Sequence, residues 1–382
     1  MINLAQKDIA HSLGKFLVTA MGVGMLFGIV LIMIGVYRGM MVDAEILLDD
    51  INADLWIVQE DTLGPFAEAS RVHEDLKDTL RAFEGIDKSE ALTFQNLQLP
   101  GETKPIRVTA VGFDVFGKIN PINPGRLVAG EPLTKEHYQI VVSEKTGYKV
   151  DDTFKLGRDI YRVAGVTRDT VSSGGDLLVY ISLKDAQNLQ FLYSNARIRS
   201  DRARGISETK EAKMANAVVA TVRAGYDIDD VANKIKQWKH ESVYTRTEQK
   251  AILTKNLIER SSKQIGLFTA ILVVVSTIII ALIIYTMTLE KMKEISIMKL
   301  IGIPNSMIIK MIVQETLILG ILAFIFGNIF SHLISDNFPK RIVLEIPDAW
   351  MLFGVVIIAS ILSSFIGVAK VIHADPAAAI GG

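Results

Sequence analysis

The stretch FLVTAMGVGMLFGIVLIMIGVY, residues 16–37, contains no charged residue and decides the fold class of the chain. At about 1.5 Å per residue, a helix of this length spans a hydrocarbon core of roughly 30 Å. Three similar stretches follow at residues 265–289, 317–334 and 350–369. Buried helices of soluble proteins rarely run so far without a polar face. The sequence therefore predicts four membrane spans, the first of them an uncleaved anchor because its apolar run exceeds that of a signal peptide.

Lysine and arginine near the ends of the spans predict their orientation. The loop after the second span carries four lysines, whereas the loop after the third carries Lys340 and Arg341 beside three acidic residues. Since cytoplasmic loops are enriched in positive charge, we expect both termini and the 290–311 loop to be cytoplasmic. The expected order is a cytoplasmic amphipathic helix at 1–15, a span at 16–38, an extracytoplasmic domain at 39–264, a span at 265–289, the cytoplasmic loop at 290–311, a span at 312–334, a short outer loop at 335–349, a span at 350–369 and a cytoplasmic tail at 370–382.

The long segment between the first two spans has the pattern of a mixed α+β domain. Strands are predicted at 54–58, 105–113, 139–143, 153–156, 160–166 and 177–183, separated by glycine, proline and aspartate turns. Apolar residues at helical spacing predict helices at 66–83 and 229–238, the second with Val231, Ile235 and Trp238 directed inward. Helical stretches at 40–51 and 247–264 adjoin the spans and would form a stalk, or ordinary juxtamembrane helices.

Composition excludes several functions. The 41 Lys+Arg and 42 Asp+Glu give a net charge of −1, which offers no basic excess for nucleic acid. With no cysteine, the chain holds no disulfide or thiolate metal site. It also lacks a P-loop, an H-E-x-x-H motif and a G-x-S-x-G elbow. We therefore expect no catalytic residue, no metal and no cofactor bound by this chain.

Two groups of residues suggest contacts. Gly24, Gly28 and Gly35 lie in the first span, where small residues allow helices to approach closely, within the bundle or with a second copy. The segment around Arg197, Arg199, Arg202 and Arg204 is rich in charge. Such runs are commonly solvated surface, and the alternative is a contact with an adaptor protein or an acidic substrate.

The loop after the second span predicts a short helix that ends sharply. In residues 289–304, Ile295, Met298 and either Ile301 or Gly302 share one face at helical spacing. Gly302 suits the position just after a helix, and Pro304 prevents simple continuation. Such a helix can lie passively under a membrane, or it can be a coupling element that docks in a partner's groove.

The segment Glu294-Ile-x-Ile-x-Lys-x-x-Gly302 resembles the E-I-G-I-L-(R/K)-A-x-G motif of FtsX/MacB-type permeases of the type VII ABC superfamily. The resemblance extends to Asn3-Leu-Ala-x-Lys-Asp8, to Val141-Val-Ser143 and Gly165-Val-Thr167 of a MacB-like outer domain, and to the closing Ala374-Asp-Pro-Ala-Ala378. The family's usual glycine and arginine are replaced by Ser296 and Lys299. Residues 195–204 are similar to the DevC-type exporter branch.

The resemblance implies a homodimeric permease of a bacterial inner membrane, without catalytic activity of its own, which binds two copies of a separate ABC ATPase. ATP and magnesium would act through that partner, and Glu294, Ile295, Met298, Lys299 and Gly302 would dock it. ATP-driven motion would reach the outer domain by mechanotransmission. With a membrane-fusion adaptor and an outer-membrane channel, the machine would export an amphipathic glycolipid, peptide, drug or haem. The alternatives are an FtsX-like signalling subunit that activates a cell-wall hydrolase, and a lipoprotein-release permease.

Overall fold

Long apolar helices and a polar, strand-rich segment fold as two separate units. The computed structural model describes residues 13–101, 103–192, 213–239, 241–335, 338 and 340–372. One unit contains the residues up to Gly39 and those from Ser261 onward, and the other is Met40–Arg260.

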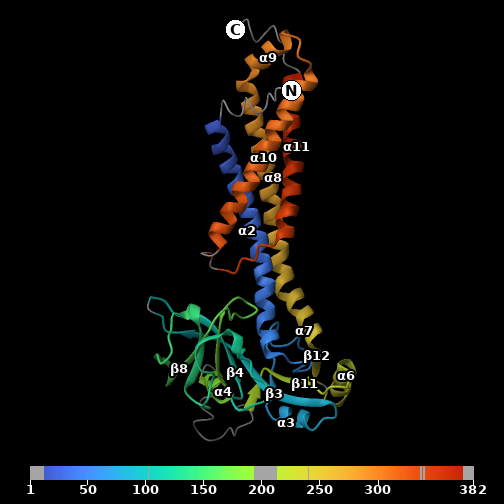
Figure 1. Cartoon of the computed structure of the whole chain (residues 1–382). Coiled ribbons are helices and arrows are strands. Elements are labelled where there is room, and N and C mark those ends of the chain that lie inside the picture. The colour runs from blue at the N-terminus through green and yellow to red at the C-terminus, as the bar shows by residue number, and fades with distance from the viewer. Residues whose placement is uncertain are drawn as a thin grey trace. The chain divides into compact units, whose positions relative to one another are not determined.

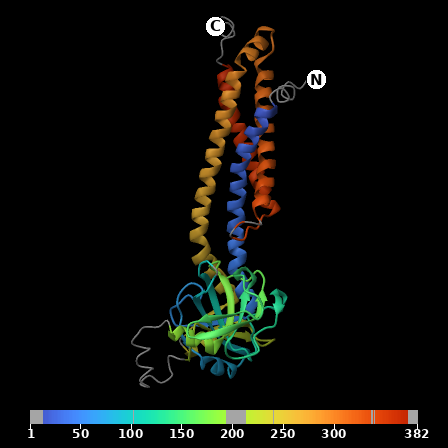
Figure 2. The same ribbon diagram turned by 90° about the vertical axis from the view of Figure 1, so that its left-hand side faces the viewer.

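The first unit contains four helices that are long and apolar enough to cross a membrane, among the residues described. They are α2 (Leu13–Ile51), α8 (Glu259–Glu290), α10 (Asn305–Ser335) and α11 (Ile346–Ile372), and the short helix α9 (Met292–Leu300) connects α8 to α10. The part of α2 from Met40 onward and the first two residues of α8 belong to the second unit. Figure 1 and Figure 2 both show these helices running alongside one another, and Figure 1 shows α9 at one end. The prediction of four spans is confirmed.

Small residues set the spacing of these helices. A methyl group on Gly24 would lie 2.6 Å from the carbonyl oxygen of Ala323, and one on Gly327 would lie 2.6 Å from the carbonyl oxygen of Gly24. At Gly28 the nearest atom would be a ring carbon of Phe330, also at 2.6 Å. The backbones of α2 and α10 therefore approach each other directly, as small residues permit in lipid.

The second unit is built on one mixed β-sheet (Figure 1). Its strands follow the order β12-β1-β11-β3-β4-β9-β6-β8-β5, and β7 pairs with β8. Their bounds are β1 Leu55–Val58, β3 Ile86–Leu99, β4 Ile106–Phe113, β5 Leu127–Gly130, β6 Gln139–Ser143, β7 Thr153–Leu156, β8 Asp159–Thr167, β9 Leu177–Ser182, β11 Ala217–Val222 and β12 Ser242–Thr245. A separate pair joins β2 (Val72–His73) to β10 (Met214–Ala215). The α+β prediction is confirmed.

Helices cover parts of this sheet. They are α3 (Leu76–Arg81), α4 (Leu183–Leu192), α6 (Ile228–Lys239) and α7 (Arg246–Leu253), and a π-helix, Thr254–Ile258, lies between α7 and α8. A capping box starts α7, because Thr245 and Glu248 each bond to the other's backbone N–H. Val231 and Ile235 of α6 are buried as predicted, but Trp238 is 47% exposed and stacks its ring at 5.3 Å from Phe83.

The predicted helix at 66–83 is wrong. Only Leu76–Arg81 is helical, whereas Val72 lies in β2 and pairs with Ala215. The apolar spacing arises because Val72, Leu76 and Leu80 all enter the same core cluster, from a strand and from a helix. These three residues follow a helical period because all of them are buried in one core, and that period therefore did not identify a single continuous helix.

Candidate functional site

The short helix α9 ends as the sequence predicts. Gly302 has a φ of +93°, a backbone conformation that L-residues rarely adopt. Its N–H donates to the carbonyl of Lys299, and the N–H of Ile303 donates to the carbonyl of Met298. These two bonds form a Schellman motif, which satisfies the last carbonyls of a helix. The last carbonyls of α9 are therefore paired with backbone N–H groups where the helix ends.

The side chains of α9 divide into a buried and an exposed set. Ile295 is buried and Met298 packs half-buried against the core of the membrane unit, whereas Glu294 is exposed. Three apolar side chains, Ile297, Leu300 and Ile301, stand in the open, Ile301 with 76% of its surface exposed. Ile295 was expected to contact a partner, but in this structure it holds α9 to its own bundle. The side chains of Ile295 and Ile301 point in directions about 120° apart around the helix axis, so they do not share one face.

Ion pairs at the same end attach α9 to its neighbours. Lys291, directly before α9, lies 3.3 Å from Glu315 of α10, and both side chains are largely buried. At the end of α8, Glu290 accepts from Lys15 of α2 at 2.5 Å, in an exposed pair. Breaking the buried pair would lower the stability of the bundle more than breaking the exposed pair, because water screens the exposed charges.

The other end of the bundle is closed by the loop before α11. Arg38 of α2 forms a double hydrogen bond with Asp348 in the first turn of α11, and lies 2.9 Å from Glu345. The N–H of Val343 donates to the carbonyl of Gly35 at 3.0 Å. A side chain on Gly35 would collide with Ile342. In this structure, Gly35 thus makes room for a loop of its own chain.

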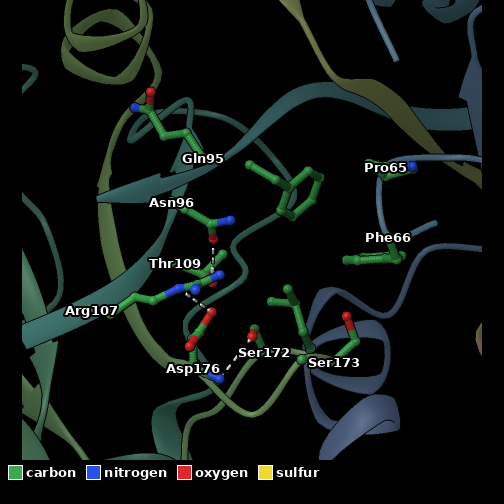
Figure 3. A pocket seen from close by; sticks show the side chains of 12 residues that line it. Pro65, Phe66, Gln95, Asn96, Arg107, Thr109, Ser172, Ser173 and Asp176 are labelled. Carbon is green, nitrogen blue, oxygen red and sulfur yellow. Dashed lines mark hydrogen bonds and ion pairs between the residues drawn. The ribbon is translucent and has the colours of Figure 1, made fainter. Parts of the chain in front are cut away.

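The outer unit contains a pocket of about 240 Å³ between the ends of β3 and β4 and the 172–176 loop (Figure 3). Antiparallel pairing sets Phe94 opposite Val111 and Asn96 opposite Thr109. On this face of the sheet, the apolar pair Phe94–Val111 is therefore followed along the two strands by the polar pair Asn96–Thr109. The lining residues are Leu47, Pro65, Phe66, Phe94, Gln95, Asn96, Arg107, Thr109, Ser172, Ser173, Gly174 and Asp176. No sequence motif marked this pocket, because pairing between distant segments creates it.

Comparison with known families identifies the chain. Residues 16–238 match the model of the MacB-like periplasmic core domain, and residues 266–376 match the FtsX-like permease C-terminal model. The chain is an ABC transporter permease of the MacB/FtsX type. It is a multi-pass membrane protein with an extracellular domain.

Relatives of this permease match over its whole length. An ABC transporter permease of Mycobacterium tuberculosis is 21% identical over 387 residues, covering 100% of both chains. The permease HrtB of Staphylococcus haemolyticus, named for a hemin transport system, is 24% identical over 395 residues, covering 100% of this chain and 99% of that one. The solved periplasmic region of MacB from Actinobacillus actinomycetemcomitans is 12% identical, with a TM-score of 0.35 over 52% of this chain and 92% of that one.

The remaining expected site residues are not all visible. Arg197, Arg199, Arg202 and Arg204 lie outside the described residues, as do the Asn3–Asp8 and Ala374–Ala378 matches. Lys299 is half-buried at the end of α9. Among the residues described, no cluster of histidine and carboxylate side chains has the geometry of a metal site.

Proposed function

We propose that this permease couples ATP hydrolysis by a separate ATPase chain to motion of its outer domain, and thereby exports an amphipathic substrate. It would act as a homodimer with two ATPase copies and a membrane-fusion adaptor. The lysines around α9 support a cytoplasmic position for that helix and for both termini. The observation that carries the proposal is the exposed apolar set on α9.

Three exposed apolar side chains on a short, rigid helix form a suitable contact for a partner's groove. Ile297, Leu300 and Ile301 would be buried by a docked ATPase, with Glu294 at the rim. The opposite side of α9 is fixed to its own bundle through Ile295. A displacement imposed on the exposed side would therefore pass to α8 and α10.

Ion pairs in the outer unit favour mechanical transmission. Glu45 of α2 lies 2.5 Å from Lys250 of α7, and Asp49 lies 2.6 Å from Arg246. Asp50, whose side chain is buried, accepts hydrogen bonds from Asn123 and Arg126 of the outer domain. These contacts join the last turns of α2 to α7 and to the loop before β5. Motion of α2 would thus be carried into the sheet.

The cargo is proposed as an amphipathic molecule, and the likeness to HrtB supports haem as one candidate. Signalling to a cell-wall hydrolase and lipoprotein release would use the same docking helix. Reconstituted permease and ATPase distinguish them, because export predicts hydrolysis stimulated by a small amphipathic cargo. Stimulation solely by a hydrolase or by a lipoprotein would assign one of the other two functions.

The docking proposal is tested by Ile301→Asp. Burying an isoleucine contributes about 1.5–3 kcal/mol, so its loss weakens docking by roughly ten- to a hundredfold. The measurement is vanadate-sensitive ATPase activity that co-purifies with the affinity-tagged permease from its native membrane. Ile346→Asp is the matched control, because Ile346 is equally exposed, at 76%, and begins α11.

We expect Ile301→Asp to lose the co-purified ATPase activity and Ile346→Asp to retain it. Full activity in the Ile301→Asp preparation would contradict the docking role. ATP hydrolysis by the permease in the absence of any second polypeptide would contradict the whole assignment.

A further inference from the structure

We propose that the pocket beside β3 and β4 binds a carboxylate that carries an aromatic or apolar group, as the acidic end of the exported molecule. This rests on the proposed export function and specifies the class of cargo. The pocket lies within the outer unit and is separate from the α9 surface that would dock an ATPase.

Its size limits what it encloses. A volume of about 240 Å³ is below the roughly 300–1,000 Å³ that surround a drug-sized ligand. It corresponds to about eight water molecules at roughly 30 Å³ each, which is enough for one ring and a short chain. The pocket therefore takes one end of a larger amphipathic molecule and leaves the rest outside.

One wall is aromatic and firmly supported. The rings of Phe66 and Phe94 lie 5.2 Å apart, and the buried indole of Trp56 packs edge-on against Phe66 at 5.2 Å. Leu47 and Pro65 complete this side. Such a wall offers ring-to-ring contact to a flat apolar group without first having to become ordered.

The opposite wall is rich in hydrogen-bond donors. Asp176 lies 3.1 Å from Nε of Arg107, which leaves the terminal nitrogens of the guanidinium for a second acceptor. The hydroxyl of Thr109 donates to Oδ1 of Asn96, so the amide nitrogen of Asn96 remains a donor. Figure 3 shows Asn96, Thr109 and Arg107 on one side of the pocket and Phe66 on the other. Guanidinium groups bind carboxylates through paired hydrogen bonds, which selects this class of head group.

A cationic amphipath fits this wall less well. Its positive charge would have to reach Asp176, whose carboxylate already forms an ion pair with Arg107. It would then lie beside a guanidinium of the same charge. The charge arrangement therefore favours an acid over an amine of the same shape.

The test compares three ligands of one shape: 4-phenylbutyrate, its neutral amide 4-phenylbutyramide, and the cation 4-phenylbutylamine. They are titrated against the full-length permease in lipid nanodiscs. The chain has three tryptophans, so Trp238→Phe with Trp350→Phe leaves the emission of Trp56 as the reporter. Trp56 contacts the Phe66 ring, so its emission should respond when a ligand enters.

We expect the acid to bind with a dissociation constant on the order of 1 mM, as small ligands do, and at least tenfold more tightly than the amide or the amine. Arg107→Gln should abolish that preference, and Arg107→Lys should keep part of it. Arg162→Gln is the matched control, because Arg162 is an exposed strand arginine paired with Asp151 and lies in β8 away from the pocket.

Equal binding of acid and amide, tighter binding of the amine, or no change in Trp56 emission up to about 20 mM acid would overturn the proposal. Arg107→Gln should leave the co-purified ATPase activity unchanged. Failure of ligand binding with intact ATPase docking would therefore reject the pocket and leave the permease function standing.

Discussion

Substituting alanine for Gly24 tests the close approach of α2 and α10. The new methyl group would lie 2.6 Å from the carbonyl oxygen of Ala323 and 2.8 Å from Cβ of Phe326, whereas ordinary contact begins at 3.4 Å. The helices must separate by about 0.8 Å at this point, which forfeits a quarter to a half of each nearby dispersion contact. Forcing a side chain into a packed interface costs about 1–3 kcal/mol.

Gly22 supplies the control, because a methyl group there meets nothing within 4 Å. Gly22→Ala gains only the helical preference of alanine, about 0.5–1 kcal/mol. We therefore expect Gly24→Ala to be about 2 kcal/mol less stable than Gly22→Ala. The free energy of unfolding is measured in mixed micelles by titration with sodium dodecyl sulfate and is followed by circular dichroism.

Equal stability of the two variants would refute the backbone contact. A difference that shrinks when the protein is diluted would assign Gly24 to a contact between copies instead, because dilution removes the stabilisation that association provides.

Two further predictions concern the outer domain. Asp50→Asn should lower its stability by about 2 kcal/mol, because Arg126 loses a buried partner, whereas Asp49→Asn in an exposed pair should cost less than about 1 kcal/mol, both measured by thermal unfolding. Burial alone would raise the pKa of Glu74, but hydrogen bonds from a neighbouring glutamine and from Lys77 outweigh it and hold that pKa below its usual value. Glu74 therefore stabilises the domain above the unfolded-state pKa of about 4.3, and the contribution disappears as pH falls through the lower folded-state value. Unfolding from pH 7 to 3 should show an acid loss that Glu74→Gln reduces.

One experimental outcome would contradict each of these two predictions. Equal melting temperatures for the Asp50 and Asp49 variants would show that the buried pair adds nothing beyond a surface pair. An acid transition that is unchanged in Glu74→Gln would place the responsible carboxyl elsewhere.

The sequence predicted what depends on local composition. The spans are uninterrupted apolar runs, and Gly302 ends α9 because a local backbone conformation requires glycine. Strands such as β4 and β6 were confirmed, since their apolar residues lie between clear turn signals. These features need no knowledge of distant parts of the chain.

Features that depend on distant pairing escaped prediction. The long strand β3 was missed because Asp87, Lys88 and Glu90 interrupt its apolar pattern, although its position beside β11 and β4 determines the sheet order. The pocket was missed for the same reason, since Arg107 and Asp176 come together only through the pairing of β4 with β9. On α9, periodicity identified the helix but did not show which side faces its own bundle.

The two helical segments that lead to and from the outer domain are wound differently. Helix α2 runs without interruption from Leu13 to Ile51, whereas the returning segment contains the π-helix Thr254–Ile258 before α8 begins. A π turn holds one residue more than an α turn. If that residue were absorbed elsewhere, every later side chain of α8 would rotate by about 100° and advance by about 1.5 Å. A rearrangement confined to five residues would thus give α8 a new lipid-facing side, while α2 offers no comparable point of adjustment.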